Sequence, residues 1–171
     1  LISMSDVSIY NIAKNIFSMT GNLIKSALRP ISVQYCKKNT NILNKKTLSI
    51  YFILGVCLYL LFLVVVDLIF PFILVGDYTQ SIELIRILCI SLVIEPLAII
   101  LLQHITFNSL VKEYTLSINI VLIIQVFLYF TLAPQYGIKG LIFVNLVIVF
   151  IRALMNTLLV RNSYLNKFKI G

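Results

Sequence analysis

The stretch TLSIYFILGVCLYLLFLVVV, residues 47–66, decides the fold class of this chain. It runs for 20 residues without a charged side chain, the length that an α-helix needs to cross a hydrocarbon core of about 30 Å. The whole chain has the same character, because 60% of its 171 residues are hydrophobic, 12% are charged and its mean hydropathy is +1.03. A soluble domain of this size cannot bury so much apolar surface. The sequence therefore predicts an all-α, polytopic transmembrane helix bundle.

Four further segments have the length and pattern of helices that cross a membrane. Short connections join them and no linker divides them, so we expect residues 1–171 to form a single transmembrane bundle. The predicted helices are residues 7–34, 48–75, 82–108, 114–133 and 138–160. The third is interrupted at Glu95-Pro96, and Pro71 marks a kink or an end in the second.

The cations of the connections predict how the bundle is oriented. Most of them fall in the 35–47 connection, the 109–113 connection and the C-terminal tail, which lie on one side of a five-helix bundle. These cations are Lys37, Lys38, Lys45, Lys46, Lys112, Arg161, Lys167 and Lys169. The other side has only Arg86 and Lys139. The excess marks the first side as cytoplasmic, so we expect a multi-pass protein of the cytoplasmic (inner) membrane with its N-terminus outside.

The beginning of the chain carries no targeting signal. It starts at Leu1 rather than Met, and it has neither a charged leader nor a cleavage site. An outside N-terminus without a signal needs an earlier helix, of which residues 1–3 would be the end. We therefore expect the chain to be the C-terminal portion of a longer transporter.

Several classes of chemistry have no motif in this sequence. The three cysteines are widely spaced, the single histidine has no HExxH, and neither GxxxxGK[ST] nor GxGxxG occurs, so we expect no metal and no cofactor. The net charge of +8 is explained by topology and by contact with anionic membrane lipids rather than by nucleic acid.

A polar stripe runs along the first predicted helix. At 100° per residue, eight polar residues fall within a sector of about 120°, and apart from Thr20 apolar residues cover the remainder. The stripe is Asn11, Lys14, Asn15, Ser18, Asn22, Lys25, Ser26 and Arg29. A cation left at the bilayer centre costs about 2.5–3.5 kcal/mol on insertion scales, so we expect the stripe to line a cavity for an anion. The alternative is a basic amphipathic helix in the membrane interface, which its narrow polar sector disfavours.

The fifth predicted helix repeats this pattern on a smaller scale. Asn145, Arg152 and Asn156 share one face. Arg152 either faces the cavity or extends along the helix toward the cytoplasmic interface.

The third predicted helix is polar on two faces, which predicts that protein rather than lipid surrounds it. Glu95 is either a buried partner for a lysine or a protonatable coupling site. His104 is expected to be a hydrogen-bonded core residue, and a proton relay is the alternative. Glu83 and Arg86, three residues apart, are expected to form a surface pair.

These patterns give three groups of candidate site residues. The substrate-binding residues are Lys14, Lys25, Arg29 and Arg152. Lys25 and Arg29, one turn apart, are expected to contribute most of the charge recognition. The cavity-lining residues are Asn11, Ser18, Asn22, Asn145 and Asn156. The candidate sites of ion coupling are Glu95 and Asp67.

Three stretches carry a family resemblance, and they occur in a consistent order. They are DVSIYNIAKNI (6–16), LIFPFILVGDYTQSIELIRILCIS (68–91) and LAPQYGIKGLIFVNLV (132–147). With its GDY turn, its L-R-I-L-like run and its YG-x-x-G, the chain resembles the polysaccharide (O-antigen) flippases of the multidrug/oligosaccharidyl-lipid/polysaccharide exporter superfamily. The sequence departs from that pattern at residues 141–143, where Leu-Ile-Phe replaces the usual small residues.

The resemblance implies a transporter and not an enzyme. Such flippases consist of two helix bundles, of which this chain would be the second. They move polyprenyl-pyrophosphate-linked oligosaccharide across the cytoplasmic membrane for surface polysaccharide biosynthesis, by alternating access through a cationic cavity. The implied partners are the lipid-linked oligosaccharide, membrane lipids and the missing N-terminal helices.

Three alternatives stay open at this point. A drug or metabolite antiporter of the same superfamily would need a membrane acid as its cation-coupling site. A membrane glycan polymerase would need a large outer loop, and the connections here are short. A non-functional transporter fragment is the third.

Overall fold

The structure is a computed structural model, which describes residues 4–38, 42–74 and 80–169, and the side chains within 7–37, 42–74 and 80–163. All regular structure in these ranges is helical. The α-helices are α1 (Met4–Lys38), α2 (Lys45–Leu68), α3 (Phe70–Ile73), α4 (Gln80–Cys89), α5 (Glu95–Phe107) and α6 (Val111–Lys169), and a 3₁₀-helix, η2 (Ile90–Val93), joins α4 to α5.

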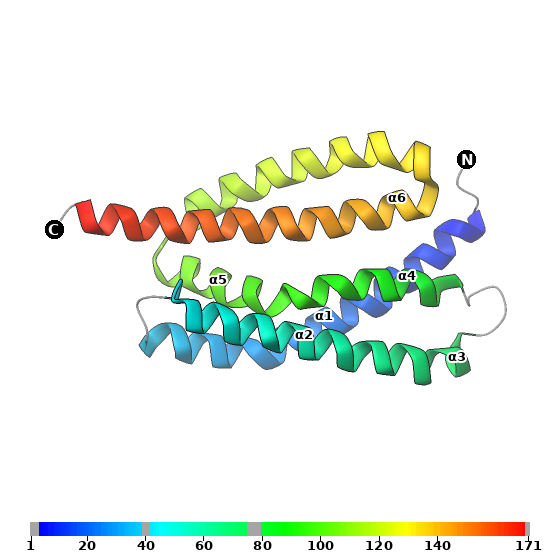
Figure 1. Cartoon of the computed structure of the whole chain (residues 1–171). Helices are drawn as coiled ribbons and strands as arrows, with labels where there is room; N and C mark the ends of the chain where they lie inside the picture. The colour runs from blue at the N-terminus through cyan, green and yellow to red at the C-terminus, as the bar shows by residue number, and fades with distance from the viewer. Residues whose placement is uncertain (1–3, 39–41, 75–79, 170–171) are drawn as a thin grey trace.

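The helices form an elongated bundle, which confirms the predicted all-α fold (Figure 1). α6 is a helical hairpin, because the chain turns back on itself at Gly137. Gly137 has φ 58° and ψ −134°, a backbone conformation that glycine adopts without steric cost. The two arms of α6 are the predicted fourth and fifth helices, and both extend beyond the predicted ends.

Prolines break the second and third predicted helices where the sequence indicates. α2 ends at Leu68, and α3 begins at Phe70 with Pro71 in its first turn. η2 ends at Val93, and α5 begins at Glu95 with Pro96 in its first turn. A proline lacks the N–H that a helix interior needs but is tolerated in the first turn, so each break lies just before its proline.

Two segments of the described chain are long and apolar enough to cross a membrane. They are Lys45–Ile73, which covers α2 and α3, and Val111–Ser163, which covers most of α6. α4 and α5, bent by 45°, would make a third if the pair is one broken span. These lengths and compositions are those of a membrane protein, and the crossing by all five predicted helices stays a prediction.

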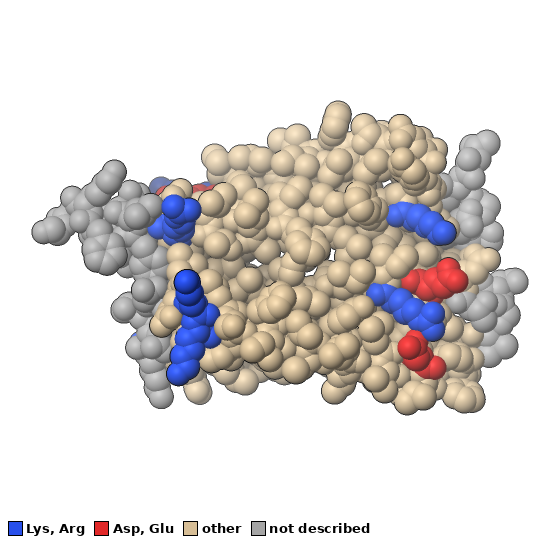
Figure 2. Space-filling model, in the orientation of Figure 1, with Lys and Arg blue, Asp and Glu red and all other residues tan. Residues whose placement is uncertain are grey.

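The ends of the helices gather at two ends of the bundle. The start of α1, the start of α4 and the turn of α6 lie at one end, and the starts of α2 and α6 lie at the other (Figure 1). On the face drawn in Figure 2, the described charged side chains lie near these two ends, and the belt between them is uncharged.

Some of the predicted features lie outside the described residues. The GDY turn and residues 1–3 belong to ranges that the structure leaves out. The side chains of Lys38, Lys167 and Lys169 are also outside the description. The side of the membrane that each end of the bundle faces remains a prediction.

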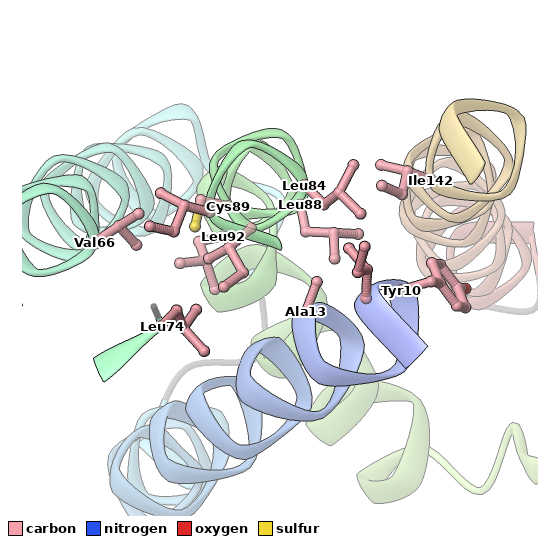
Figure 3. Packing of buried hydrophobic residues seen from close by; sticks show 12 residues of the cluster. Tyr10, Ala13, Val66, Leu74, Leu84, Leu88, Cys89, Leu92 and Ile142 are labelled. Atoms are coloured by element: carbon pink, nitrogen blue, oxygen red, sulfur yellow. The ribbon is translucent and has the colours of Figure 1, made fainter. Parts of the chain in front are cut away.

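The broken unit α4–η2–α5 lies at the centre of the bundle, as its two polar faces predict. Leu84 and Leu88 of α4 pack with Tyr10 and Ala13 of α1 and with Ile142 of α6 in one apolar cluster (Figure 3). On the other side, α2 approaches η2 so closely that a Cβ atom on Gly55 would lie 2.0 Å from the carbonyl oxygen of Val93. Only glycine permits that approach.

Candidate substrate groove

A groove lies between α1 and the second arm of α6, with α4, η2 and α5 as its floor. It consists of two adjoining cavities of about 250 Å³ each. We name them by their polar residues. The arginine lobe is lined by Arg29, Gln103, Tyr114, Arg152 and Asn156, and the amide lobe by Lys14, Ser18, Asn22, Gln125 and Asn145. The two lobes share Lys25, Glu95, Val149 and Arg152.

The polar stripe of α1 forms one wall of this groove. Its helical spacing of three and four residues places successive members on one face, and those from Lys14 to Arg29 follow the groove from the amide lobe into the arginine lobe. The stripe members on the groove are Lys14, Ser18, Asn22, Lys25 and Arg29. Asn11, Asn15 and Ser26 line neither lobe. The prediction that Asn11 lines the cavity is wrong, because Asn11 is exposed outside both lobes.

The second arm of α6 forms the opposite wall. Asn145, Arg152 and Asn156 lie seven and four residues apart on one face, and all three line the groove. Arg152 reaches both lobes. This position agrees with the interpretation that Arg152 faces the cavity rather than the membrane interface.

An ion pair lies where the two lobes meet. Lys25 Nζ is 2.9 Å from Glu95 Oε1, and the two side chains are 56% and 15% exposed. The break before α5 makes Glu95 the first residue of that helix and places its carboxylate on the floor of the groove. Of the two interpretations of Glu95, the geometry is that of a partner for a lysine.

The ion pair changes which cations are available to a ligand. Glu95 neutralises Lys25, whereas neither Arg29 nor Arg152 forms an ion pair within the described residues. The uncompensated positive charge of the arginine lobe therefore comes from two arginines on opposite walls. Their guanidinium groups suit a phosphate or a carboxylate, because each can donate two parallel hydrogen bonds.

A chain of hydrogen bonds joins the two walls at the amide lobe. Asn145 Nδ2 donates to the Tyr10 hydroxyl at 2.8 Å, and the Tyr129 hydroxyl donates to Asn145 Oδ1 at 2.7 Å. Gln125 Nε2 donates to the Tyr129 hydroxyl at 3.2 Å. We call these four residues the clasp. The asparagine that the sequence assigned to cavity lining thus also holds α1 to α6.

The arginine lobe contains a polar atom without a partner. Asn156 is 3% exposed, and its Oδ1 has no hydrogen-bond donor within the described part of the chain. A buried acceptor left unsatisfied costs about 1–3 kcal/mol. The two asparagines of the same wall therefore differ, because the clasp satisfies Asn145.

Asp67 lies apart from the groove. Its Oδ1 accepts from Arg86 Nε at 2.9 Å and lies 2.8 Å from Arg86 Nη2. The predicted pair of Arg86 with Glu83 is therefore wrong, because Arg86 pairs across to α2 instead. Both partners are about half exposed, at 52% and 49%, so the pair resembles a surface salt bridge.

His104 is buried and hydrogen-bonded, as predicted for a core residue. Its Nε2 lies 3.1 Å from Asn108 Nδ2, and its side chain is 4% exposed. Among the described residues, no three His, Cys, Asp or Glu side chains come together as a metal site requires.

Several residues of the groove belong to no stripe that the sequence predicts. Gln103, Tyr114 and Gln125 are among them. Gln125 gave a usable signal, because it is an amide in the middle of the uncharged stretch 114–138. A polar residue at that depth needs a partner inside the bundle.

No protein-family model, curated protein or solved structure matches this chain. The resemblance to polysaccharide flippases thus remains a prediction from the sequence, and the case for a function depends on the groove.

Proposed function

We propose that this chain is a bundle of a transporter that moves polyprenyl-pyrophosphate-linked oligosaccharide across the cytoplasmic membrane for surface polysaccharide biosynthesis. The observation that carries the proposal is the arginine lobe, where Arg29 and Arg152 face one cavity from opposite walls of an apolar bundle. Keeping two such cations in a membrane bundle is costly. Binding of a pyrophosphate offsets that cost, because it offers several anionic oxygens to two guanidinium groups.

The shape of the groove also suits a ligand of this kind. The amide lobe supplies hydroxyl, amide and ammonium groups for a polar glycan, while the apolar outer surfaces of α2 and α6 can lie against lipid with the prenyl tail. Translocation needs no covalent chemistry, so the chain has no catalytic role in this proposal. The groove would open alternately to each side as this bundle rocks against a second one.

The groove supports a flippase better than a cation-coupled antiporter. An antiporter needs an acid that is free to bind a proton or a metal cation. The two candidate acids, Glu95 and Asp67, already have Lys25 and Arg86 as partners.

A binding experiment tests the proposal directly. The chain is placed in nanodiscs and titrated with a fluorescent polyprenyl-pyrophosphate-linked disaccharide. The variant with Arg29→Gln and Arg152→Gln should bind about a hundredfold more weakly, because each lost charge-assisted contact accounts for about a factor of ten.

The matched control removes two cations that line neither lobe. Lys37→Gln with Arg161→Gln changes the net charge by the same amount at exposed positions, and its affinity should equal that of the wild type. Equal loss in both double variants would mean that the protein attracts the ligand only through its overall charge, and the proposal would fail.

A further inference from the structure

A pyrophosphate does not explain the unsatisfied oxygen of Asn156 in the arginine lobe. A phosphate oxygen accepts hydrogen bonds, and so does Asn156 Oδ1. The arginines of the lobe are donors, yet neither bonds to Oδ1 in the structure. The lobe therefore holds two kinds of group, donors for an anion and an acceptor for a hydrogen-bond donor.

The positions of these groups bring the two kinds of contact close together. Arg152 and Asn156 are four residues apart and so lie one turn apart on the same face of α6. Arg29 faces the same cavity from α1. The backbone positions of Arg152 and Asn156 lie about 5 Å apart along the helix axis, so a ligand that contacts both side chains presents an anion and a donor near each other.

The size of the lobe limits how much of a ligand it holds. Its volume of about 250 Å³ is below the roughly 300–1,000 Å³ of sites that enclose a drug-sized molecule. A whole oligosaccharide does not fit, but a phosphate and the sugar attached to it do. Ala98, Ile99 and Leu102 line the same lobe and give it an apolar side.

We infer that Asn156 selects the first sugar of the lipid-linked glycan by accepting a hydrogen bond from the hydroxyl or acetamido group on the carbon next to the anomeric carbon. A sugar joined to phosphate through its anomeric carbon carries a hydroxyl or an acetamido N–H at that neighbouring carbon. The donor then lies beside the anion, as the spacing of Arg152 and Asn156 requires. This inference rests on the proposed function and adds a determinant of specificity to it.

Three probes separate the contacts of the lobe. They are farnesyl pyrophosphate, the same compound bearing N-acetylglucosamine, and its counterpart whose sugar lacks any substituent at the carbon next to the anomeric one. The chain in nanodiscs should bind the N-acetylglucosamine probe about tenfold more tightly than the deoxy probe, since one buried acceptor gains or lacks its donor.

Variants of Asn156 assign that preference to its side chain. Asn156→Leu cannot accept a hydrogen bond, so the two sugar probes should bind with equal affinity. Asn156→Asp keeps an acceptor and should retain the preference, although its charge weakens the binding of all pyrophosphates. Asn119→Leu is the matched control, because Asn119 is an exposed asparagine of the same helix outside both lobes, and it should behave as the wild type.

The outcomes distinguish this inference from the proposal beneath it. Equal affinity of the wild type for the two sugar probes overturns the inference alone, as does a preference that persists in Asn156→Leu. If no pyrophosphate probe binds to the wild-type chain, the proposed function fails and the inference fails with it.

Discussion

Each lobe of the groove contains an asparagine of α6, and the two asparagines differ in whether their side chains have hydrogen-bond partners. In the amide lobe, the clasp satisfies Asn145 with two tyrosine hydroxyls. In the arginine lobe, the oxygen of Asn156 has no donor, and Arg29 and Arg152 lack ion-pair partners within the described residues. Polar groups that satisfy one another hold the bundle together, whereas groups left unsatisfied favour a ligand. The contrast separates two asparagines on the same wall of one helix, because Asn145 is held by the clasp and the oxygen of Asn156 is left for a ligand.

The strongest test of this contrast makes the same substitution in both lobes. Asn145→Leu removes the donor to the buried Tyr10 hydroxyl and the acceptor of the Tyr129 hydroxyl. It should therefore lower the free energy of unfolding by about 2–4 kcal/mol. Asn156→Leu removes an acceptor that already lacks a partner, so it should not lower that free energy and should raise it by about 1–3 kcal/mol, the cost of the unsatisfied group. Both values are measured in detergent micelles by titration with a denaturing detergent.

Asn119→Leu serves as the control for the change of side chain at an exposed position of α6. A cost at Asn156 as large as that at Asn145 would remove the distinction between the lobes. The result would then point to a structural role for Asn156.

A second test addresses the ion pair where the lobes meet. Lys25→Glu places a second carboxylate beside Glu95 and should weaken binding of a polyprenyl-pyrophosphate glycan about tenfold. Glu95→Gln releases Lys25 from its partner, so it should strengthen binding a few-fold. Both affinities come from titration of the chain in nanodiscs.

The exchanged pair, Lys25→Glu with Glu95→Lys, is the control for this test. It keeps the ion pair and the net charge of the groove, and its affinity should approach that of the wild type. Loss of binding in Glu95→Gln would show that Glu95 serves the ligand or a coupling ion directly, and not as a counter-charge.

The smallest effect is expected at the pair that lies apart from both lobes. Asp67→Asn removes the charge that Arg86 contacts at the surface, and exposed pairs of this kind contribute about 0–1 kcal/mol. Thermal unfolding at low and at high salt measures the effect, which should shrink as salt screens the pair. A larger loss that salt does not alter would mean that the pair is shielded from solvent by lipid or by another chain.

The sequence predicts the features of this fold that depend on neighbours along one helix. The stripe of α1 follows from a spacing of three and four residues, and the break before Glu95 follows from Pro96. Both are local properties, and the structure shows both. The central place of α4–η2–α5 also follows, because a helix with two polar faces has no side to present to lipid.

The pairings between helices could not be predicted in the same way. Glu95 and Lys25 are 70 residues apart, and Asn145 and Tyr10 are 135 apart. A helical wheel gives the direction of a side chain around its own axis and not the neighbour that lies there. For the same reason the spacing along the chain indicates Glu83 as the partner of Arg86, although Arg86 pairs with Asp67 on α2.

The clasp has a mechanical consequence for any motion of this bundle. It fixes α1 to α6 at Tyr10, and Arg29 lies nineteen residues further along the same helix, a distance of about 28 Å at 1.5 Å per residue. If α1 pivots as a rigid rod about the clasp, a tilt of about 10° moves Arg29 by about 5 Å. In such a motion the hydrogen bonds of the clasp would move little. The side chains of Arg29 and Arg152 would separate by about the width of a phosphate group.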